Sequence, residues 1–309
     1  MLHVPVLLEE TVSRLVTAPG GWYLDATAGA GGHASALLAA AGLDARLLVL
    51  DRDGRALELA RAALAPFGGR AVLERANFSE MAAAAARCGV RGFRGILMDL
   101  GVSSMQLDEA ARGFSFREEA PLDMRMDDRQ ELTAAELLRR LAPEELAQVL
   151  RRYGEEPMAK RIARAVGEAL ARGEPLETTT QLAALVERAK GGRRGRIHPA
   201  TQTFQALRIA VNGELEALEQ ALPAALDLLE PGGRLAVISF HSLEDRMVKQ
   251  FMTAHEGRME SLARGGARWS GTLPRARRVA RKPVTPSEEE VRRNPRSRTA
   301  KLRVLERMA

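Results

Sequence analysis

Short apolar runs alternate with stretches of helical periodicity along the first hundred residues of the chain. The apolar runs lie at 23–26, 46–51, 71–75 and 95–100, and helical patterns rich in alanine and leucine lie between them, as at 34–41 and 55–64. Such alternation is typical of a parallel sheet covered by helices. It predicts an α/β fold with a doubly wound, mostly parallel sheet.

The strand pattern is interrupted in the middle of the chain. From 108 to 206 we find helix signals without a convincing strand. Thr133 and Glu136 have the spacing of a capping box, and Pro143 stands where proline is tolerated at the start of a helix. This segment is therefore predicted to be an inserted all-helical domain, with a role in substrate recognition.

Strand character returns after the insertion. At 231–240 a Pro-Gly-Gly turn precedes a fully apolar run, which suits a buried parallel strand. A last strand is expected at 302–305, paired with one near 278–280. We therefore expect one sheet domain built from 1–107 and 207–309.

Composition indicates an ordinary globular protein. Hydrophobic residues make up 46% and charged residues 28% of the 309 residues. Cys88 is the only cysteine, which excludes an internal disulfide and a cysteine-cluster metal site. The first ten residues lack a basic leader and no apolar run has membrane-spanning length, so we expect a soluble, cytoplasmic protein.

The excess positive charge is concentrated in two places. The formal net charge is +6, and one basic cluster occupies 190–196. The other contains Arg264, Arg275, Arg277, Arg278, Arg281, Lys282, Arg292, Arg293, Arg296, Arg298 and Lys301. One such cluster is as often a solvated surface as a binding site. Two clusters interrupted by glycine or proline favour a nucleic-acid partner, because flexible basic loops can follow a phosphate backbone.

A glycine-rich turn follows the first predicted strand, in the sequence Asp25-Ala-Thr-Ala-Gly-Ala-Gly-Gly-His33. Glycines at this point let a ligand approach the backbone at the carboxyl edge of the sheet. Gly29, Gly31 and Ala34 also satisfy the spacing of a dinucleotide fingerprint, although that match is weak by itself. The turn alone leaves two cofactor classes open.

Of three acids at the ends of predicted strands, Asp25 separates the two classes. Asp51, after the second strand, suits a ribose diol in either class. Asp25, ahead of the glycines, would repel a pyrophosphate but attract the ammonium of S-adenosylmethionine (SAM), which also carries a cationic sulfonium. With Asp99 after the fourth strand, the acids predict an electronegative SAM pocket. A nicotinamide-dependent dehydrogenase and a non-catalytic RNA-binding assembly factor remain the alternatives.

The segment from Asp99 to Ser104 is the candidate for chemistry. Transfer to an exocyclic base amine needs an acceptor for the amine hydrogens, and Asp99 could take that role or could bind only the cofactor. An extruded base also needs aromatic neighbours, for which Phe114, Phe116 and Phe240 are candidates, though each is more often a core residue.

Other polar residues give weaker signals. Asp123 and Arg125 more often form a structural ion pair than a site. His33 and His198 lack partners at metal-ligand spacing, so no metal is implied. Ser239-Phe-His-Ser242 lacks the strand-turn-helix context of a hydrolase nucleophile.

The chain resembles the MraW (small subunit methyltransferase H) family of 16S rRNA cytosine-N4 methyltransferases over nearly its whole length. The residues that carry the resemblance lie at 3–10, 25–33, 51–53, 99–107, 112–127, 197–209, 232–249 and 294–298. The resemblance implies a Rossmann-like SAM-methyltransferase sheet with an inserted helical domain. It also implies methylation of a cytidine N4 amine in the decoding region of 16S rRNA, with the small ribosomal subunit as the partner.

The resemblance also implies site residues. By motif match, the SAM contacts would be Gly31, Gly32, His33, Asp51, Phe78, Asp99 and Gln106, in addition to Asp25. Phe78 would lie beside the adenine. The chain has Asp99-Leu-Gly-Val where related amine methyltransferases carry Asp/Asn-Pro-Pro-aromatic, so Asp99 and Ser104, helped by 112–125, are both candidates to bind the amine. A monomer and a homodimer both remain open.

Overall fold

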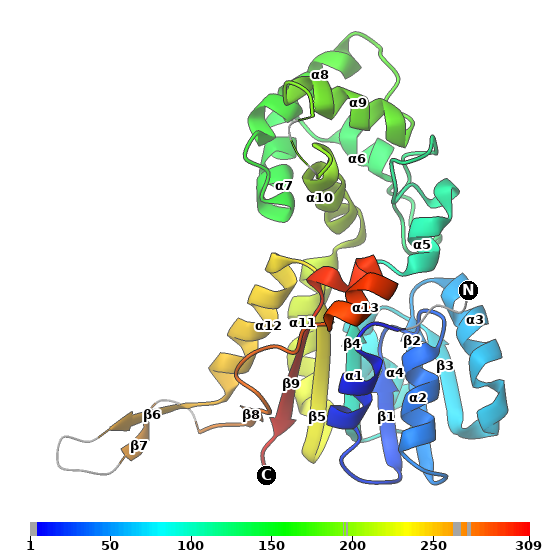
Figure 1. The fold of residues 1–309 in the computed structure, drawn as a ribbon, viewed down its shortest axis with the longest axis vertical. Coiled ribbons are helices and arrows are strands. Elements are labelled where there is room, and N and C mark those ends of the chain that lie inside the picture. Colours follow the sequence, from blue (N-terminus) through cyan, green and yellow to red (C-terminus); the bar gives the residue numbers. More distant parts are fainter. Residues whose placement is uncertain (1–4, 194, 196, 262–266, 271–272) are drawn as a thin grey trace. The chain divides into compact units, whose positions relative to one another are not determined.

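The computed structural model describes residues 5–193, 195, 197–261, 267–270 and 273–309 (Figure 1). The chain divides into two compact units. Unit 1 comprises Met1–Gly101 and Leu215–Ala309, and unit 2 comprises Val102–Glu214. Unit 2 extends beyond the expected insertion at both ends, because α5 and the whole of α10 belong to it.

Unit 1 is built on a seven-stranded sheet in the order β3-β2-β1-β4-β5-β9-β8. The strands are β1 (Gly21–Asp25), β2 (Ala45–Asp51), β3 (Ala71–Arg75), β4 (Phe93–Asp99), β5 (Leu229–Ser239), β8 (Ala276–Arg278) and β9 (Lys301–Arg307). The first five strands pair in parallel, whereas β9 is antiparallel to both of its neighbours. The predicted α/β class and mostly parallel sheet are confirmed.

The boundary of β5 differs from the prediction. The strand begins at Leu229, and the expected turn at Pro231 lies inside it as an irregularity of the pairing with β4, between Leu229 and Arg234. Gly232 has φ +78° there, a left-handed conformation that glycine adopts without strain. The pairing of the last strand with a segment near 278 is confirmed as β8 with β9.

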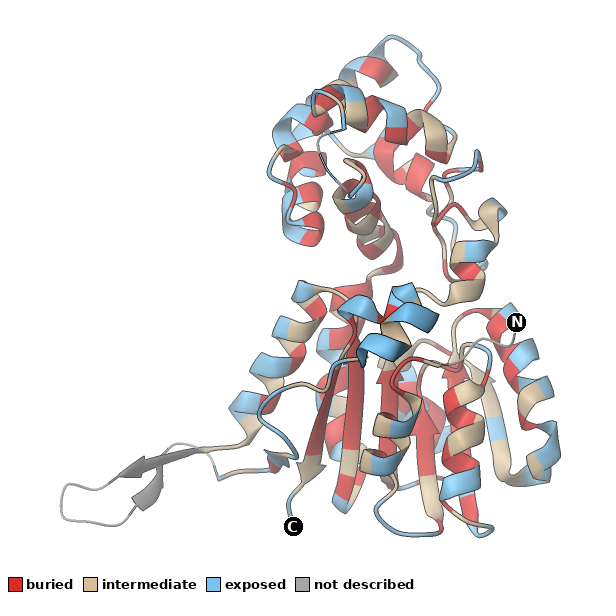
Figure 2. Cartoon of the chain, in the orientation of Figure 1, coloured by how far each residue is buried: buried red, intermediate tan, exposed pale blue. Residues whose placement is uncertain are grey.

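Helices cover both faces of this sheet (Figure 1). On one face lie α1 (Leu8–Leu15), α2 (Gly32–Ala40) and α3 (Gly54–Leu64), and on the other α4 (Met81–Arg87), α11 (Glu214–Leu228) and α12 (Ser242–His255). The shorter elements of the unit are η1 (Ala65–Arg70), η2 (Phe78–Glu80), α13 (Glu288–Arg293) and η4 (Pro295–Thr299). Leu47 to Leu50 of β2 are all fully buried, as a strand covered on both faces requires (Figure 2).

Unit 2 is helical. Its elements are α5 (Ser104–Asp108), η3 (Ala110–Arg112), α6 (Ala134–Arg140), α7 (Pro143–Gly154), α8 (Ala159–Ala171), α9 (Thr179–Ala189) and α10 (Thr201–Asn212). Among its described residues no strand forms, and the single bridge joins Pro121 to Thr178. Thr133 caps α6 as predicted, but the Glu136 carboxylate pairs with Arg139 and Arg140 rather than completing a capping box.

Two further strands, β6 (Arg258–Ser261) and β7 (Ala267–Ser270), form a separate antiparallel pair that the sequence did not predict. Several residues that figured in the sequence predictions lie outside the described part of the chain, namely His3, Arg194, Arg196 and Arg264. Within that part, no helix combines the length and apolarity needed to cross a membrane.

Candidate functional site

Three carboxylates stand at one edge of the unit 1 sheet. Asp25, Asp51 and Asp99 are the last residues of β1, β2 and β4, which are adjacent parallel strands. Because the carboxyl ends of parallel strands meet at the same edge, the three predicted acids are brought together there. This edge is where open α/β sheets bind ligands.

The glycine-rich turn is bonded to these strand ends. The Thr27 N–H donates to Asp25 Oδ1 at 3.1 Å, and the Gly29 N–H donates to Asp51 Oδ2 at 3.0 Å. The backbone N–H of Asp99, at the end of the neighbouring strand β4, donates to Thr27 Oγ1 at 2.7 Å. The turn therefore holds the carboxylates of Asp25 and Asp51 and the backbone of Asp99, and Thr27 is a residue that the sequence reasoning missed.

The glycines of the turn have different structural roles. Gly31 has φ +82°, and a Cβ there would lie 2.9 Å from the Ala60 Cα of α3. A Cβ on Gly32 would clash with the ring of Pro5. Gly29 has φ +50° and open space around the position of a Cβ. Packing thus explains Gly31 and Gly32, whereas Gly29 borders space that a ligand can enter.

Two carboxylate oxygens at this edge lack a counterpart. Among the described residues, neither Asp25 Oδ2 nor Asp99 Oδ1 has a hydrogen-bond partner, although both atoms are buried. Buried carboxylates without partners are unfavourable, and a cation placed between them would relieve that cost. These two carboxylate oxygens therefore fit a cationic ligand such as SAM.

Burial raises the pKa values of all three carboxyl groups. Burial, with the nearby Asp51 carboxylate, raises the pKa of Asp25 to about 7, and burial raises the pKa of Asp51 to about 6. Burial, with the carboxylates of Asp25 and Glu244, raises the pKa of Asp99 well above its ordinary value. The Asp99 side chain keeps 25% of its surface exposed, although its Oδ1 atom is buried.

His33 connects this edge to the start of the described chain. Its Nε2 lies 3.1 Å from the Val6 carbonyl oxygen, and its Nδ1 lies 3.6 Å from Asp99 Oδ2. A carbonyl oxygen only accepts, so Nε2 must carry a hydrogen. Nδ1 then faces the Asp99 carboxyl at a distance longer than a hydrogen bond.

A fourth acid, missed by the sequence reasoning, lies near Asp99. Glu244 is buried at the start of α12, where its Oε2 accepts hydrogen bonds from the N–H groups of Phe240 and His241 at 2.8 and 3.3 Å. His241 and Glu244 together form a capping box, and that spacing is visible in the sequence. His241 therefore serves as a helix cap in the Ser239–Ser242 segment.

The remaining predicted cofactor residues belong to other elements of the chain. Phe78 opens η2 after β3 and packs against the core of unit 1. Ser104 and Gln106 belong to α5 in unit 2, where Gln106 forms a capping box with Ser103. The structure thus gathers Asp25, Asp51, Asp99 and His33 at one edge, and describes Ser104 and Gln106 with the other unit.

The predicted aromatic and ionic features of unit 2 have clear positions. Phe116 packs against His198 and Phe204, with ring centroids 4.7 Å apart in both pairs. Arg125 and Asp123 form the expected structural ion pair, with a closest distance of 2.7 Å. In the described part of the chain, no group of three His, Cys, Asp or Glu side chains could hold a metal ion.

Several side chains of the two basic clusters are bound to acidic or carbonyl groups within the protein. Lys190 of the first cluster donates to the buried Glu156 carboxylate at 2.8 Å and to the Pro199 carbonyl oxygen at 3.0 Å. In the second cluster, ion pairs join Arg275 to Asp227, Arg277 to Glu306 and Arg278 to Glu256. Arg281 and Lys282 are exposed.

Comparison with known proteins gives a consistent result over the whole chain. The model of the MraW methylase family matches residues 1–308. The ribosomal RNA small subunit methyltransferase H of Dehalococcoides mccartyi is 49% identical over 314 residues, covering 99% of this chain and 86% of that protein. The protein of the same name from Cyanothece sp. is 50% identical over 307 residues, covering 99% and 95%. The chain therefore belongs to the MraW methylase family of SAM-dependent methyltransferases.

Proposed function

We propose that this enzyme methylates the N4 amine of a cytidine in the decoding region of 16S rRNA, within the small ribosomal subunit. The observation that carries the proposal is the pair of buried carboxylate oxygens without partners, on Asp25 and Asp99. They make a site for a cation next to a group that can accept amine hydrogens. The RNA substrate is supported by the names of the curated relatives.

Different residues at the sheet edge bind different parts of the cofactor. In this proposal Asp25 binds the cationic part of SAM, Asp51 accepts hydrogen bonds from the ribose hydroxyls, and Phe78 lies beside the adenine. When bound, SAM supplies an activated methyl group: the acceptor lone pair forms the nitrogen–carbon bond as the carbon–sulfur bond breaks with its electrons on sulfur, and the nitrogen loses a proton.

Asp99 is the proposed acceptor for the amine hydrogens. Its Oδ1 is the unpartnered atom, and a hydrogen bond from the amine would hold the nitrogen lone pair away from the base ring. A carboxyl whose pKa is raised by burial is also a better proton acceptor near neutral pH. His33, 3.6 Å from Asp99 Oδ2, can share the proton once Asp99 holds it.

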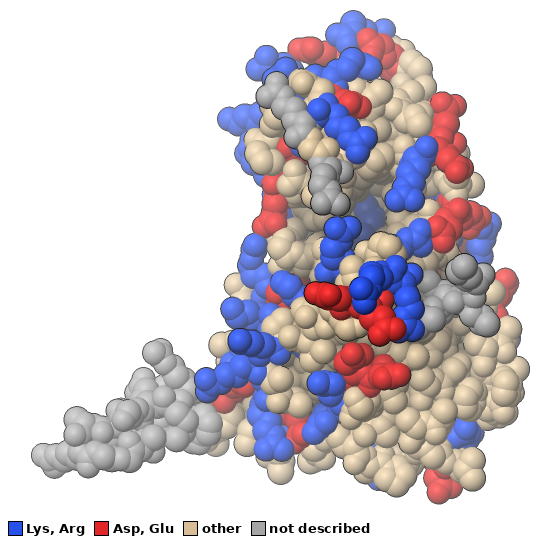
Figure 3. Space-filling model, viewed as in Figure 1, with Lys and Arg blue, Asp and Glu red and all other residues tan. Residues whose placement is uncertain are grey.

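Basic side chains supply the attraction for RNA. Lys and Arg residues, shown in blue in Figure 3, are spread over both units, and in unit 1 they gather over the part that holds α12 and β8. The exposed Arg281 and Lys282 lie three and four residues after the end of β8. Contacts of this kind bind the phosphate backbone and weaken as the salt concentration rises. The reaction is proposed to take place in the cytoplasm, where small subunits assemble.

The test is to incubate the enzyme and labelled SAM with small subunits that lack the modification, with free 16S rRNA and with DNA, and then to map the methylated base. We expect N4-methylcytidine at one position in 16S rRNA of the subunits. Asp51→Ala should weaken SAM binding by about 10- to 100-fold, since it removes charge-assisted hydrogen bonds. Asp99→Asn should lower kcat by about 100-fold or more, because an amide cannot take the proton.

The alternatives predict other outcomes. A nicotinamide-dependent dehydrogenase would bind its dinucleotide rather than SAM when titrated with each cofactor, and would leave every substrate unlabelled. A non-catalytic assembly factor would bind subunits without transferring label and would tolerate Asp51→Ala and Asp99→Asn. Label on a different base, or on DNA alone, would contradict the proposed substrate.

A further inference from the structure

The start of the described chain packs against the glycine-rich turn. A Cβ on Gly32 would clash with the ring of Pro5, so the two residues are in close contact. Val6 and Leu7 are buried, with exposed fractions of 6% and 1%, in the apolar cluster that also contains Leu97 of β4. Packing therefore fixes the segment 5–7 beside the turn.

Leu7 is held in a strained conformation. Its φ is +53° and its ψ is +39°, a left-handed region that residues with a side chain rarely adopt. Such a conformation persists only where the surrounding structure holds it. Burial of the Leu7 side chain supplies one such contact, and a hydrogen bond from its N–H to Glu290 Oε1, at 2.9 Å, supplies another. The bond joins residues that are 283 positions apart in the sequence.

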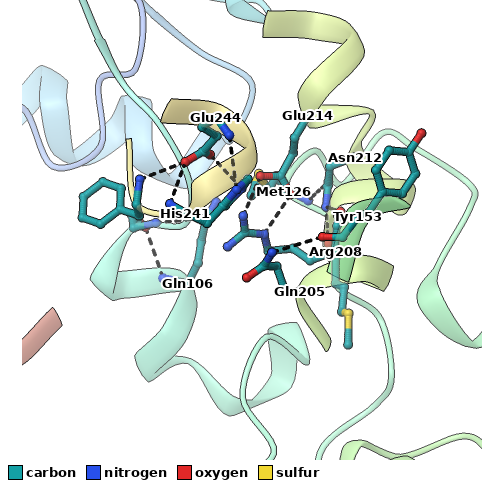
Figure 4. Close-up of polar contacts among 12 residues, drawn as sticks. Gln106, Met126, Tyr153, Gln205, Arg208, Asn212, Glu214, His241 and Glu244 are labelled. Carbon is teal, nitrogen blue, oxygen red and sulfur yellow. Dashed lines mark hydrogen bonds and ion pairs between the residues drawn. The ribbon is translucent and has the colours of Figure 1, made fainter. Parts of the chain in front are cut away.

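The Glu290 carboxylate binds this distant partner instead of its own helix. Ser287 and Glu290 have the spacing of a capping box at the start of α13, and Ser287 Oγ accepts from the Glu290 N–H at 3.1 Å. In such a box the glutamate normally accepts from the N–H of the capping residue, as Glu244 does from His241 in α12 (Figure 4). Glu290 accepts from Leu7.

The segment 294–298, which carries part of the family resemblance, supports α13 at its other end. The Asn294 N–H donates to the Glu290 carbonyl oxygen at 2.7 Å, where the helix ends. Ser297 is fully buried, and its Oγ donates to the Asn294 carbonyl oxygen at 2.8 Å. This turn leads directly into β9, so it holds the helix that presents Glu290 next to the sheet.

His33 and Glu290 bind opposite ends of one peptide group. The His33 Nε2 lies 3.1 Å from the Val6 carbonyl oxygen, and the N–H of the same planar peptide is that of Leu7. The carbonyl oxygen only accepts, so Nε2 carries the hydrogen. The Glu290 charge polarises the peptide and makes its oxygen a stronger acceptor, as linked hydrogen bonds do. Glu290 therefore favours the imidazole tautomer with hydrogen on Nε2.

This tautomer affects Asp99, the proposed acceptor for the amine hydrogens. In a neutral ring with hydrogen on Nε2, the His33 Nδ1 carries a lone pair, and it lies 3.6 Å from Asp99 Oδ2. A hydrogen on Nδ1 would instead stabilise the ionised Asp99 carboxylate and make it a weaker proton acceptor. The orientation of the ring therefore matters for the step in which the amine loses its proton.

We propose that Glu290 is a positioning residue of this enzyme. Through the Leu7 peptide it fixes the orientation and the tautomer of His33, which in turn faces Asp99 with a lone pair. The inference rests on the proposed function for the role of Asp99, and it deepens that function by assigning a task to the two segments 3–10 and 294–298. It also explains why the strained Leu7 conformation is held by a carboxylate.

The tautomer of His33 can be measured directly. Nitrogen chemical shifts distinguish a ring nitrogen that carries hydrogen from one with a lone pair, and His33→Gln identifies its signals among those of the five histidines. At about pH 8, above the ordinary pKa of imidazole, we expect hydrogen on Nε2 in the ligand-free parent. Glu290→Ala should give a mixture of tautomers, and so should Glu290→Asp, whose shorter side chain withdraws the carboxylate from Leu7. Glu290→Gln keeps an acceptor and should retain the parent's tautomer.

The rate of methylation should follow the tautomer. We expect Glu290→Ala to lower kcat for small subunits by about tenfold with KM within about threefold, because its effect is exerted through His33 on the reacting groups. Glu290→Gln should recover most of this activity. Glu288→Ala is the matched control, since Glu288 is exposed in the first turn of the same helix and its loss removes the same charge. It should match the parent in both measurements.

The outcomes separate the two proposals. If Glu290→Ala and Glu290→Asp keep the parent's tautomer, the positioning role is overturned, whatever happens to kcat. A mixture of tautomers in Glu288→Ala as well would also overturn it, because the effect would then belong to the charge of α13 in general. If the parent methylates no cytidine, the proposed function fails, whereas a tautomer change confined to Glu290→Ala and Glu290→Asp would still support the positioning of His33.

Discussion

Gly31 serves two structural purposes at once. It occupies a left-handed conformation at the start of α2, and its bare Cα allows α3 to approach so closely that a Cβ would lie 2.9 Å from the Ala60 Cα. We expect Gly31→Ala to lower the free energy of unfolding by about 2–4 kcal/mol, because backbone strain and overpacking add. Urea denaturation of the ligand-free protein measures this change.

Gly213 is a matched control for this prediction. It also has a left-handed backbone, with φ +58°, but nothing lies within 4 Å of the position of its Cβ. Gly213→Ala should therefore lose only about 1 kcal/mol, the cost of the conformation alone. Equal losses in the two variants would show that the approach of α3 is not what requires Gly31.

Single residues differ in how far the sequence reveals them. The position of Asp25, Asp51 and Asp99 at one edge of the sheet was predictable, because each ends an apolar strand and parallel strands end at one edge. The hydrogen bond from Gln205 to the Tyr153 carbonyl oxygen was not predictable, since it is a contact between two helices. The packing roles of Gly31 and Gly32 were hidden for the same reason, as their neighbours Ala60 and Pro5 are not adjacent in sequence.

At the scale of elements, the start of α12 connects helix stability with the site. Glu244 accepts the N–H groups of Phe240 and His241 and lies close enough to Asp99 to raise its pKa. Glu244→Ala should reduce the free energy of unfolding by about 1–2 kcal/mol, because the cap is lost. Glu244→Gln keeps an acceptor for the cap and should lose less than half as much in the same denaturation experiment.

The two variants should also differ from the parent in the titration of Asp99. Both remove a negative charge near that carboxyl, so both should lower its pKa and shift the acidic limb of the kcat profile to lower pH. A stability loss without this shift would mean that Glu244 acts only as a cap. A shift in Glu244→Gln without a large stability loss is the expected signature of its charge.

Elements with strong local patterns were foreseen, and those that depend on distant partners were not. Four predicted strands match β1 to β4 closely, because buried apolar runs between helices are unambiguous. The start of β5 was wrong, since pairing with β4 extends the strand past Gly232 to Leu229. The pair β6 and β7 was missed, because its short segments carry no apolar run.

At the scale of the whole molecule, the number of basic side chains in a cluster overstates the positive charge that it can offer to RNA. In the second basic cluster, Arg275, Arg277 and Arg278 form ion pairs with acids. Their partners Asp227 and Glu306 lie far away in the sequence, so no reading of local charge runs could identify the pairs. Exposed residues such as Arg281 and Lys282 are therefore better indicators of a phosphate contact than the size of the cluster.

The buried acids make the stability of the whole protein depend on pH. Unfolding would return the pKa of Asp25 from about 7, and that of Asp51 from about 6, to 3.8, so the folded state binds more protons between these values. Stability of the ligand-free protein should consequently fall as pH rises from about 4 to 7. For Asp25 alone, a pKa of about 7 rather than 3.8 corresponds to about 4 kcal/mol.

SAM should reverse this trend, because a cationic ligand favours the ionised carboxylates that the ligand-free fold disfavours. We expect the increase in Tm caused by saturating SAM to grow as pH is raised from 5.5 to 7.5, as measured by scanning calorimetry. Asp25→Asn should raise the Tm of the ligand-free protein at pH 7.5 and remove much of the pH dependence of the SAM effect, since its amide does not titrate. A Tm increase that is constant or declines over this range would contradict the assignment of Asp25 to the cationic part of SAM.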